Sequence, residues 1–503
     1  MDTSFGKFGI VQFAVIYISL FIPVVIGYLI IVNFPILLTF PWFFLLIPIG
    51  IGFFFLLLFI SLLVTIIAMK FCNRAFPPHE GSFDLDLSVK DIRGWMYRRT
   101  IKSFALLLFG LVKINTLKVL MLRSFGIKIG KNVKLYGMVI DDPFIEIGDN
   151  FILGRRAVIA GHLYDHIKLT FNKTIIGNNC IIEPVAGAVG ATLGDNTIIK
   201  HGCGALRGQR TRGNGIFKGV PMSRVGNYSD LTPEEVQEIH DLVDLYNKRD
   251  IDEEKLRPIK INSWKFNIYK MLMVIVGLLA VAGIGLLYYF TLFQLLYFQL
   301  GGFLGVFLAL VLIPFFILMG IVFFVLPIIF ITKKIVTPSV PEGEYELDSA
   351  EASEWKFKYL VKKFCLSVIH STPFAILDVF VLMYLGNKIG KNCVIKEGLV
   401  DPEYLDLGDY VIISALSRVH THNIIDGKLV LKGIKIGDKV VLGGVSHLDV
   451  GAEVGENSLL GIATYVKPNK KLKPNALYMG KPAIKYPKDL LKKIWIEPKK
   501  EYE

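Results

Sequence analysis

A six-residue rhythm of one aliphatic residue followed by glycine constrains this chain more than any other feature of its sequence. The rhythm is clearest in the last quarter of the chain, at Ile389-Gly390, Leu407-Gly408, Ile436-Gly437, Leu442-Gly443 and Val454-Gly455. One aliphatic side chain in six points into a narrow interior, and glycine suits a corner that needs a positive φ or a close backbone approach. Three such segments close one triangular coil of a parallel β-helix, in which each coil buries its aliphatic face against its neighbours.

The rhythm occurs twice, at a constant spacing. The segment KIGKN at residues 128–132 recurs 260 positions later at residues 388–392, and His162 falls on His422 at the same spacing. The longest interruption of the rhythm is residues 419–429, which contain His420 and His422. We therefore expect two copies of one unit, each a helical hairpin followed by a β-helix.

Two long stretches of the chain carry no charged side chain. Residues 8–69 and 271–332 contain no Asp, Glu, Lys or Arg, and the mean hydropathy of the chain is +0.52. A helix that spans a bilayer needs about 20 apolar residues, so each stretch holds two such helices. The first stretch is too long for a cleaved signal peptide and lacks a small-residue cleavage site. We expect the four helices near residues 10–32, 43–69, 271–298 and 302–332.

Positive charges flank the ends of both predicted hairpins, whereas the two tight turns carry none. The flanking residues are Lys7, Lys70, Arg74, Lys260, Lys265, Lys270, Lys333 and Lys334. The positive-inside rule then places both termini and both β-helices in the cytoplasm of a multi-pass membrane protein. Much of the formal net charge of +13 lies at these ends and in the C-terminal tail, which favours anionic lipid over nucleic acid as a partner.

The segments between each hairpin and its β-helix are less clear. Residues 81–99 look polar and irregular, whereas residues 101–123 and 362–385 are apolar runs with scattered basic residues. Such a run is either a helix in the membrane interface or a core helix packed on the β-helix, and both alternatives stay open. Residues 232–248 predict a charged helix that joins the two copies.

The predicted fold class is therefore membrane α-helical hairpins plus an all-β parallel β-helix of hexapeptide repeats, internally duplicated. The expected domains are transmembrane hairpin 1 (8–69), a connector with an interfacial helix (70–124), β-helix 1 (125–226), a helical linker (227–261), transmembrane hairpin 2 (268–332), a second connector with an interfacial helix (333–384), β-helix 2 (385–485) and a basic tail (486–503).

The His segment, the coil opened by Ile436-Gly437 and the closing Met479-Gly480-Lys481-Pro482-Ala483 resemble the hexapeptide-repeat, left-handed β-helix acyltransferases that acetylate sugars. The resemblance covers residues 125–225 and 385–485. It implies left-handed coils, acetyl-coenzyme A or another acyl thioester as co-substrate, no metal, and a His as catalytic base, which His422 and His162 match. It also implies a coenzyme A groove beside the last coils, for which the expected residues are Gly443, Gly461, Lys467, Gly480 and Lys481.

The alternation of membrane hairpins with tandem β-helices is also similar to the membrane-embedded terminal region of amide-forming ligases of the poly-lysine-synthetase kind. In that architecture the tandem soluble domains condense an amino acid that an attached adenylation domain activates. We see no adenylation domain in these 503 residues. This resemblance therefore implies an alternative function, amide-bond formation from an aminoacyl thioester made by a separate enzyme.

The chemistry of acyl transfer explains why a His is expected. A base must take a proton from the hydroxyl or amine acceptor during attack on the thioester, and imidazole titrates near neutral pH. Asp426 and Asp165 are candidates to fix the tautomers of His422 and His162. Backbone N–H groups at glycine corners, for instance Gly443, are candidates to stabilise the oxyanion.

The two predicted sites are not equivalent in sequence. The second β-helix has the more regular repeats, so His422 is the preferred base if only one site works. Arg207, Arg210 and Arg212 in the first β-helix are either a solvated basic loop or a holder of phosphate-bearing parts of a ligand.

Other classes of function are weaker alternatives. His162, His166 and His201 suggest γ-class carbonic anhydrases, which bind zinc through three His on a similar β-helix, but the order of their spacings differs. A non-catalytic membrane scaffold is favoured if both His162 and His422 lack a groove beside them. The expected partners are the lipid bilayer, a small-molecule or lipid-linked acceptor and a homo-oligomer, and not nucleic acid.

Overall fold

The structure is a computed structural model of the chain, in which the described residues fall into ten segments. These are residues 5–34, 46–112, 114–165, 168–248, 256, 258–261, 263–294, 302–372, 378–395 and 398–487. Residues 488–503 of the predicted basic tail, and parts of the predicted tight turns of the two hairpins (residues 33–35 and 301–302), lie outside the described residues.

Four helices are long and apolar enough to cross a membrane. They are α1 (Phe5–Asn33), α2 (Leu46–Ala75), α7 (Ser263–Leu287), which a π-helical segment extends over Tyr288–Phe293, and α9 (Gly302–Val336). Each overlaps one helix that the uncharged stretches predict, although α2 continues six residues further and α7 begins eight residues earlier than expected. These helices continue past the basic residues at their ends, because lysine and arginine fit into a helix whose next turn packs on the rest of the chain.

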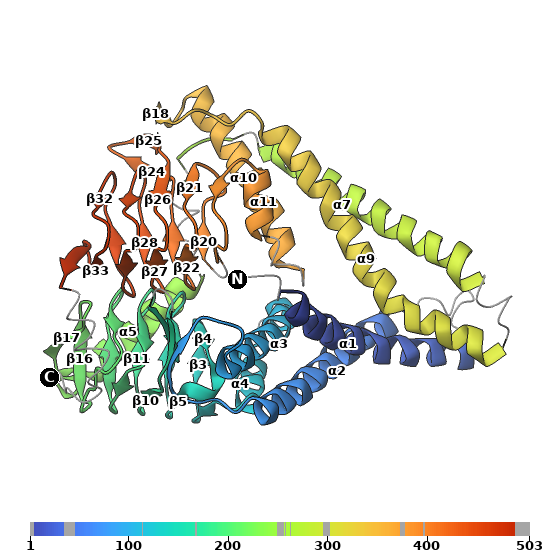
Figure 1. Cartoon of the computed structure of the whole chain (residues 1–503), viewed down its shortest axis with the longest axis horizontal. Helices are drawn as coiled ribbons and strands as arrows, with labels where there is room; N and C mark the ends of the chain where they lie inside the picture. Colours follow the sequence, from blue (N-terminus) through green and yellow to red (C-terminus); the bar gives the residue numbers. More distant parts are fainter. Residues whose placement is uncertain are drawn as a thin grey trace.

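The two helical hairpins diverge where they leave the β-helices and meet again at their far ends (Figure 1). At that meeting point the Tyr17 hydroxyl on α1 donates to the Val311 carbonyl on α9 at 2.6 Å. Both β-helices lie on the same side of the hairpins (Figure 1). The second hairpin is therefore tied to the first by direct contact as well as by the intervening chain.

The N-terminal β-helix is a prism of three sheets that the chain visits in turn. Its parallel strands pair with those one coil away, and only the last strand of the second sheet is antiparallel to its neighbour among the described residues. Its first sheet contains β2 (Lys128–Ile129), β5 (Ile145–Ile147), β10 (Thr174–Ile176) and β13 (Thr192–Leu193). The second contains β3 (Lys134–Leu135), β6 (Ile152–Leu153), β11 (Ile181–Ile182), β14 (Thr197–Ile199), β16 (Gly215–Lys218) and β17 (Ser223–Gly226). The third contains β4 (Met138–Ile140), β7 (Val158–Ala160), β12 (Gly187–Val189) and β15 (Gly204–Ala205).

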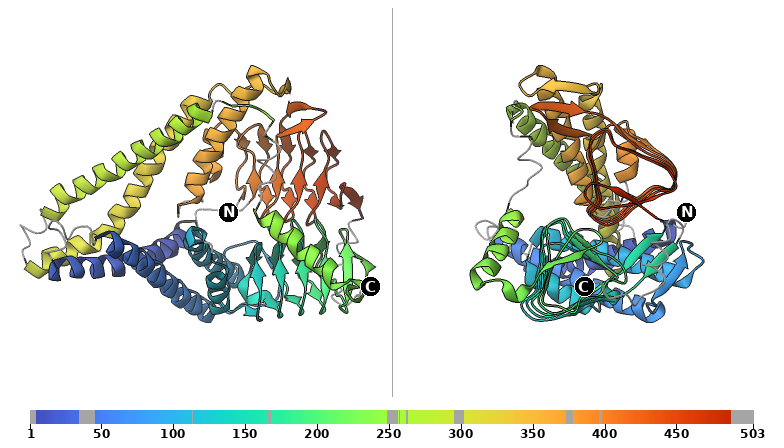
Figure 2. Two further views of the ribbon diagram at one scale, coloured as in Figure 1. Left: turned by 180° about the vertical axis from the view of Figure 1, so that it is seen from behind. Right: turned by 90° about the vertical axis from the view of Figure 1, so that its left-hand side faces the viewer.

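The C-terminal β-helix is built in the same way, and Figure 2 shows both prisms end-on in its right-hand view. Its first sheet contains β19 (Lys388–Ile389), β21 (Leu405–Leu407), β26 (Ile434–Ile436), β29 (Glu453–Val454) and β32 (Lys471–Leu472). The second contains β22 (Ile412–Ile413), β27 (Val441–Leu442), β30 (Leu459–Leu460), β33 (Leu477–Met479) and β34 (Ile484–Tyr486). The third contains β20 (Leu399–Val400), β23 (Arg418–Val419), β28 (His447–Leu448) and β31 (Tyr465–Val466).

The corners of the coils use asparagine for positive φ and glycine for close approach. Asn150, Asn179 and Asn196 have φ between 54° and 57°, and their side-chain amides form a ladder from coil to coil at 2.9 and 3.0 Å. A Cβ on Gly148, by contrast, would stand 2.7 Å from the carbonyl carbon of Gly177 in the next coil. The glycine of the six-residue rhythm is therefore required because adjacent backbones touch there.

Each predicted His begins an antiparallel hairpin that leaves the prism. The first hairpin is β8 (His162–Asp165) with β9 (Lys168–Phe171), and the second is β24 (His422–Ile425) with β25 (Lys428–Leu431). A third strand from the connector pairs with the outer strand of each hairpin, namely β1 (Gly81–Asp84) and β18 (Gly343–Glu346). These small sheets place the connector directly above the His.

The connectors are more ordered than their composition predicts. The expectation that residues 81–99 are irregular is wrong, because β1 lies there and helix α3 already begins at Lys90. The connector helices are α3 (Lys90–Val112), α4 (Asn115–Ser124), α10 (Ala350–His370) and α11 (Asp378–Tyr384). The prediction was wrong because it considered only the many polar residues of this segment. Helices α3 and α10 each pack on a β-helix through one tryptophan, Trp95 and Trp355, which are 4% and 1% exposed. These contacts match the packed alternative for the first half of each helix.

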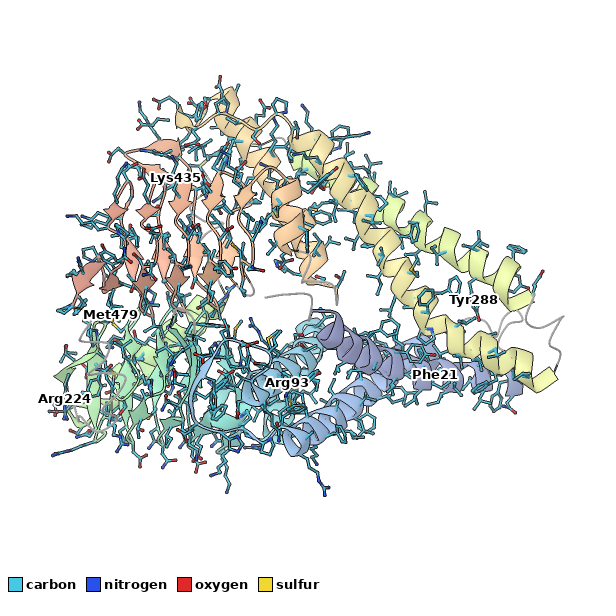
Figure 3. All side chains as sticks on the ribbon, in the orientation of Figure 1. Phe21, Arg93, Arg224, Tyr288, Lys435 and Met479 are labelled. Atoms are coloured by element: carbon cyan, nitrogen blue, oxygen red, sulfur yellow. The ribbon has the colours of Figure 1, made fainter. Side chains whose placement is uncertain are left out.

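The two β-helices pack side by side through apolar outer faces. Ile412 and Val441, which point outward from the second sheet of the C-terminal prism, form one cluster with Val158 of the N-terminal prism. Ile462 fills the seam, because a Cβ on Gly204 would stand 2.6 Å from its Cγ2. Met479, labelled in Figure 3, lies at the same junction. The prisms therefore share a buried interface.

Helix α5 (Pro233–Lys248) covers the corresponding face of the N-terminal β-helix. Ile152 and Ile181, which stand 260 positions before the two residues that face the other prism, pack against Ile239 and Val243 of α5. Thr232 begins the helix as expected for a capping box: its hydroxyl accepts from the Glu235 N–H, and the Glu235 carboxylate accepts from the Thr232 N–H at 2.8 Å. The same face is thus buried by different elements in the two prisms.

Candidate active site

His162 lies on the first residue of β8 and pairs with a carboxylate from the preceding coil. Its Nδ1 contacts Asp141 Oδ2, and the Gly161 N–H donates to the same oxygen at 3.1 Å. The other oxygen of Asp141 accepts from Trp95 Nε1 on α3 at 2.8 Å. The carboxylate thus joins the His to the connector helix, and the His162 side chain keeps 12% of its surface exposed.

The ionisation of Asp141 determines which nitrogen of a neutral His162 carries the proton. Burial alone would raise the pKa of Asp141, but the neighbouring His162, the hydrogen bonds from His162 and Trp95, and the charge of Lys102 hold that pKa below its ordinary value. An ionised Asp141 accepts from Nδ1–H, which leaves Nε2 with its lone pair. A neutral His162 in this tautomer is oriented to receive a proton at Nε2.

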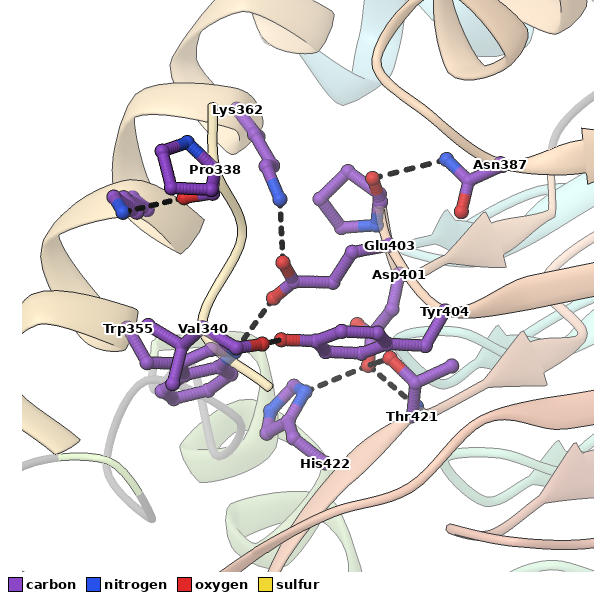
Figure 4. A network of polar contacts seen from close by, with 12 residues as sticks. Pro338, Val340, Trp355, Lys362, Asn387, Asp401, Glu403, Tyr404, Thr421 and His422 are labelled. Carbon is purple, nitrogen blue, oxygen red and sulfur yellow. Dashed lines mark hydrogen bonds and ion pairs between the residues drawn. The ribbon is translucent and has the colours of Figure 1, made fainter. Parts of the chain in front are cut away.

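His422 occupies the same position in the C-terminal β-helix (Figure 4). Its Nδ1 lies 2.6 Å from Asp401 Oδ2, which also accepts from the Thr421 N–H at 2.7 Å. The pKa of Asp401 is lowered to about 2: burial works against ionisation, but His422, His420 and the Thr421 N–H favour the charged form. In this site Trp355 does not reach the aspartate, because its Nε1 donates to Glu403 Oε1 at 2.5 Å.

Trp95 and Trp355 pack against the His in the two sites, and a further aromatic ring contacts each His but comes from a different element in each site. In the N-terminal site the ring is Tyr164 on the hairpin, with its centroid 5.1 Å from that of His162. In the C-terminal site it is Tyr359 on the connector helix, 4.9 Å from His422. The position on α3 that corresponds to Tyr359 is Arg99, whose guanidinium lies 5.2 Å from the centre of the Trp95 ring. A cation therefore replaces a phenol beside His162.

A groove of about 1060 Å³, part of it open to solvent, runs between the two prisms beside His162. Its N-terminal wall includes Arg99, His162, Tyr164 and Arg207. Its C-terminal wall is apolar except for Ser414 and includes Ile412, Ala415, Val441, Gly443, Gly444, Leu459, Gly461, Ile462 and Met479. His422 is not among the lining residues of this groove. This groove therefore lies beside His162, and not beside the His422 that repeat regularity favours.

The five residues expected along a coenzyme A groove are divided by the structure. Gly443 and Gly461 line the groove, but on the wall opposite His162 rather than beside His422. Gly480 follows β33 and has a φ of +94°. The Lys481 side chain reaches the N-terminal prism, because a Cβ added to Gly202 would stand 2.0 Å from its Nζ. Lys467 is exposed on a turn and is not a lining residue.

Two expectations about supporting groups are wrong. Asp165 and Asp426 lie at the far ends of the hairpins from the His residues: Asp165 pairs in register with Lys168, and Asp426 lies in the turn that follows β24. The Gly443 N–H is not an oxyanion donor, because it donates to the Leu460 carbonyl at 2.7 Å within the ladder between coils. The N–H of a glycine at such a corner is already used in the hydrogen bonds between coils and is not available to a substrate.

Among the described residues, no group of three His, Cys, Asp or Glu side chains is placed to hold a metal ion. His166, which the carbonic anhydrase alternative requires, lies outside the described residues. Arg207 lines the groove, as the phosphate-holding alternative for the basic loop requires.

The sequence contained a signal for the missed residues. Trp95, Lys102 and Asp141 recur 260 positions later as Trp355, Lys362 and Asp401, the same spacing that relates His162 to His422. Arg99 gives no such signal, because its counterpart is Tyr359. A search for polar residues at this spacing would have found the carboxylate partner of each His.

Comparison with known proteins gives two kinds of similarity. No protein-family model matches the chain. The δ-poly-L-ornithine synthetase of Acinetobacter baumannii (strain AB307-0294) is 26% identical over 156 residues, which are 31% of this chain and 12% of that protein.

Among solved structures, a maltose O-acetyltransferase from Clostridium difficile 630 has a TM-score of 0.24 and 17% identity, over 31% of this chain and 95% of that one. A hexapeptide-repeat-containing acetyltransferase from Vibrio cholerae O1 biovar eltor, complexed with acetyl coenzyme A, has a TM-score of 0.24 and 16% identity, over 28% and 91%. A galactoside acetyltransferase in complex with coenzyme A has a TM-score of 0.25 and 17% identity, over 29% and 88%. The chain is thus similar both to hexapeptide-repeat acetyltransferases and, over a short segment, to a poly-ornithine synthetase.

Proposed function

We propose that this chain is a membrane-anchored acyltransferase that works in the groove between its two β-helices, with His162 as general base. The observation that carries the proposal is the His162–Asp141 pair at the edge of a groove whose opposite wall is a second β-helix. The left-handed coil sense, the anchoring of the hairpins in the bilayer and the cytoplasmic position of both prisms belong to the same proposal. The acyl donor is coenzyme A or another thioester.

The reaction follows from the positions of the groups. The acceptor hydroxyl or amine lies at Nε2 of His162, which takes its proton while the acceptor attacks the thioester carbonyl. Asp141 holds the imidazole through Nδ1 and stabilises the imidazolium that forms. The carbon–sulfur bond then breaks, and the proton on His162 passes to the departing thiolate. The apolar C-terminal wall excludes water, so transfer is favoured over hydrolysis.

Amide-bond formation is the second candidate, and the segment shared with the poly-ornithine synthetase favours it. The same base serves an amine acceptor and an aminoacyl thioester, so only the substrates differ. The groove beside His162 argues against a purely non-catalytic scaffold, for which no groove is expected at the His.

The test is thiol release from acetyl-coenzyme A by the detergent-purified protein, over a panel of hydroxyl and amine acceptors. A His162→Asn variant is expected to lose about 100-fold or more of the acceptor-dependent rate, since a general base contributes about 10²–10⁴-fold. His422→Asn is the matched comparison, because its site has the same aspartate but does not line the groove. A rate that survives His162→Asn in a folded protein would remove His162 as the base.

A further inference from the structure

Helix α3 reaches the N-terminal site through Trp95, which is buried near the beginning of the helix. The indole Nε1 donates to Asp141 Oδ1 at 2.8 Å, and the indole ring centroid is 5.3 Å from that of His162. Asp141 contacts His162 through its other carboxylate oxygen. Trp95 thus touches both members of the acid–base pair, yet it is not a lining residue of the groove.

The contact with α3 also affects the charge of the pair. Burial raises the pKa of Asp141, whereas His162, the hydrogen bond from Trp95 and the charge of Lys102 lower it. Two of these three favourable groups, Trp95 and Lys102, lie on α3. The ionised carboxylate that orients His162 therefore depends on the position of this helix.

The end of α2 holds α3 at the turn that carries Trp95. Phe76 directly follows α2, and its backbone carbonyl accepts from the guanidinium of Arg98 on α3 at 2.8 Å. A Cβ on Gly94, the residue before Trp95, would stand only 2.6 Å from the Cβ of Phe76. Because the two segments touch there, a displacement of α2 moves the indole N–H relative to Asp141.

The C-terminal site lacks this connection between the connector helix and the aspartate. Trp355 Nε1 donates to Glu403 Oε1 at 2.5 Å (Figure 4). Asp401 pairs with His422 and accepts from the Thr421 N–H, and both of these groups belong to its own prism. The equivalent tryptophan is therefore equally buried but acts on a different carboxylate, which makes it a matched comparison.

We propose that Trp95 is a positioning residue for the His162–Asp141 pair, and that α3 makes the orientation of this pair depend on the packing of α2. The inference rests on the proposed function, because it concerns the base of that reaction. Trp95 acts through Asp141: it holds Oδ1 so that Oδ2 faces Nδ1 of His162. A shift of α2 is therefore expected to change kcat rather than KM.

Trp95→Phe keeps an aromatic ring in place and removes the N–H. We expect kcat for acceptor-dependent thiol release to fall about 10-fold with KM unchanged, since a hydrogen bond to a charged group accounts for an effect of this size. The acid limb of the pH profile of kcat is expected to move upward by about half a pH unit or more, because the less compensated charge of Asp141 retains the proton on the imidazolium more strongly.

Trp355→Phe is the matched variant, and it is expected to change neither kcat nor the pH profile, because Trp355 donates to Glu403. Equal losses of kcat in the two variants, with an unshifted profile in both, would show that the tryptophans only support the fold.

Modification of His162 by diethyl pyrocarbonate measures the same contact without turnover. The reagent reacts with neutral imidazole, and tandem mass spectrometry distinguishes His162 from His422 in one sample. In Trp95→Phe we expect the pH midpoint of the reaction at His162 to rise and that at His422 to stay. A raised midpoint together with a rate that survives His162→Asn would remove His162 as the base and leave the positioning contact standing. An unmoved midpoint would overturn the contact, whatever the activity.

A double-mutant cycle tests the connection to α2. Gly94→Ala forces Phe76 and α3 apart, although alanine itself favours a helix more than glycine does. We expect Gly94→Ala to lower kcat about 3-fold or more in the wild type and to have no further effect in Trp95→Phe, because the displaced N–H is then already absent. Independent, multiplicative losses in the double variant would overturn the coupling of α2 to the base through Trp95.

Discussion

The chemistry of both candidate sites depends on one residue that the His alone does not reveal. Each aspartate follows a short strand one coil before its His and reaches it because successive coils stack. Sequence distance is 21 residues in both cases, and no local pattern links the two. The His could be predicted from the interruption of the rhythm, whereas its partner required the stacking of coils or the spacing of 260.

Replacing Asp141 by Asn is expected to lower the acceptor-dependent rate about 100-fold or more, with little change in KM. Asn neither holds Nδ1–H of His162 as an ionised acceptor nor stabilises the imidazolium. Steady-state kinetics of thiol release measures the effect. Asp401→Asn is the matched change, and a larger loss there would mean that the C-terminal site is the working one.

The low pKa of Asp401 makes a prediction about acid stability. The ordinary pKa is 3.8 and that in the fold is about 2, so the ionised form contributes stability that is complete above pH 4 and is lost as pH falls toward 2. A shift of this size corresponds to about 2 kcal/mol. The difference in melting temperature between wild type and Asp401→Asn is expected to be constant from pH 6 to about 4 and to shrink below it. A constant difference down to pH 2 would contradict the assignment.

At the scale of elements, the same face of the two prisms is buried in two different ways. Outward-facing aliphatic residues at equivalent positions, Ile181 and Val441, look alike in sequence, yet one meets α5 and the other meets the neighbouring prism. The helix itself was predictable from its charges, although the residue that caps it is Thr232. The face on which α5 packs was not predictable, because an apolar face must be buried but does not determine which element buries it.

Charging the buried side of α5 is expected to release the helix. Val243 is fully buried against the N-terminal prism. Val243→Asp would place a carboxyl group there without a hydrogen-bond partner, at a cost of about 2–7 kcal/mol even in its neutral form. Hydrogen exchange of the α5 amides is expected to become fast while the amides of the coils stay protected. Glu238→Ala, on the exposed side, is the control. Unchanged protection of α5 in Val243→Asp would show that the helix is held by other contacts.

At the scale of the whole molecule, the groove exists because two prisms of one chain meet. The β-helices and the four apolar helices were predictable from rhythm and from uncharged runs, since both are repeated one-dimensional patterns. The pairing of the prisms was not, because it depends on the fit of Ile462 against Gly204, two residues far apart in the chain.

Filling the seam is expected to separate the walls of the groove. Gly204→Val would bring side-chain atoms within 2.6 Å of Ile462, so the prisms must move apart and the transfer rate is expected to fall about 10-fold or more. Adding Ile462→Ala in the same protein makes room and is expected to recover part of the loss. Gly226→Val, where the nearest atom is 3.6 Å from an added Cβ, is the control. A double variant as slow as the single one would contradict the role of this contact.

The meeting of two non-identical prisms also bears on how such a groove changes over generations. In a ring of identical subunits each β-helix presents both walls, so a substitution on one wall is repeated at every interface. Here the walls are separate stretches of one chain, and the equivalents of Val158 and Gly187 at the seam are Arg418 and His447, large polar residues. Each wall is a separate stretch of sequence, so a substitution on one wall leaves the other wall unchanged.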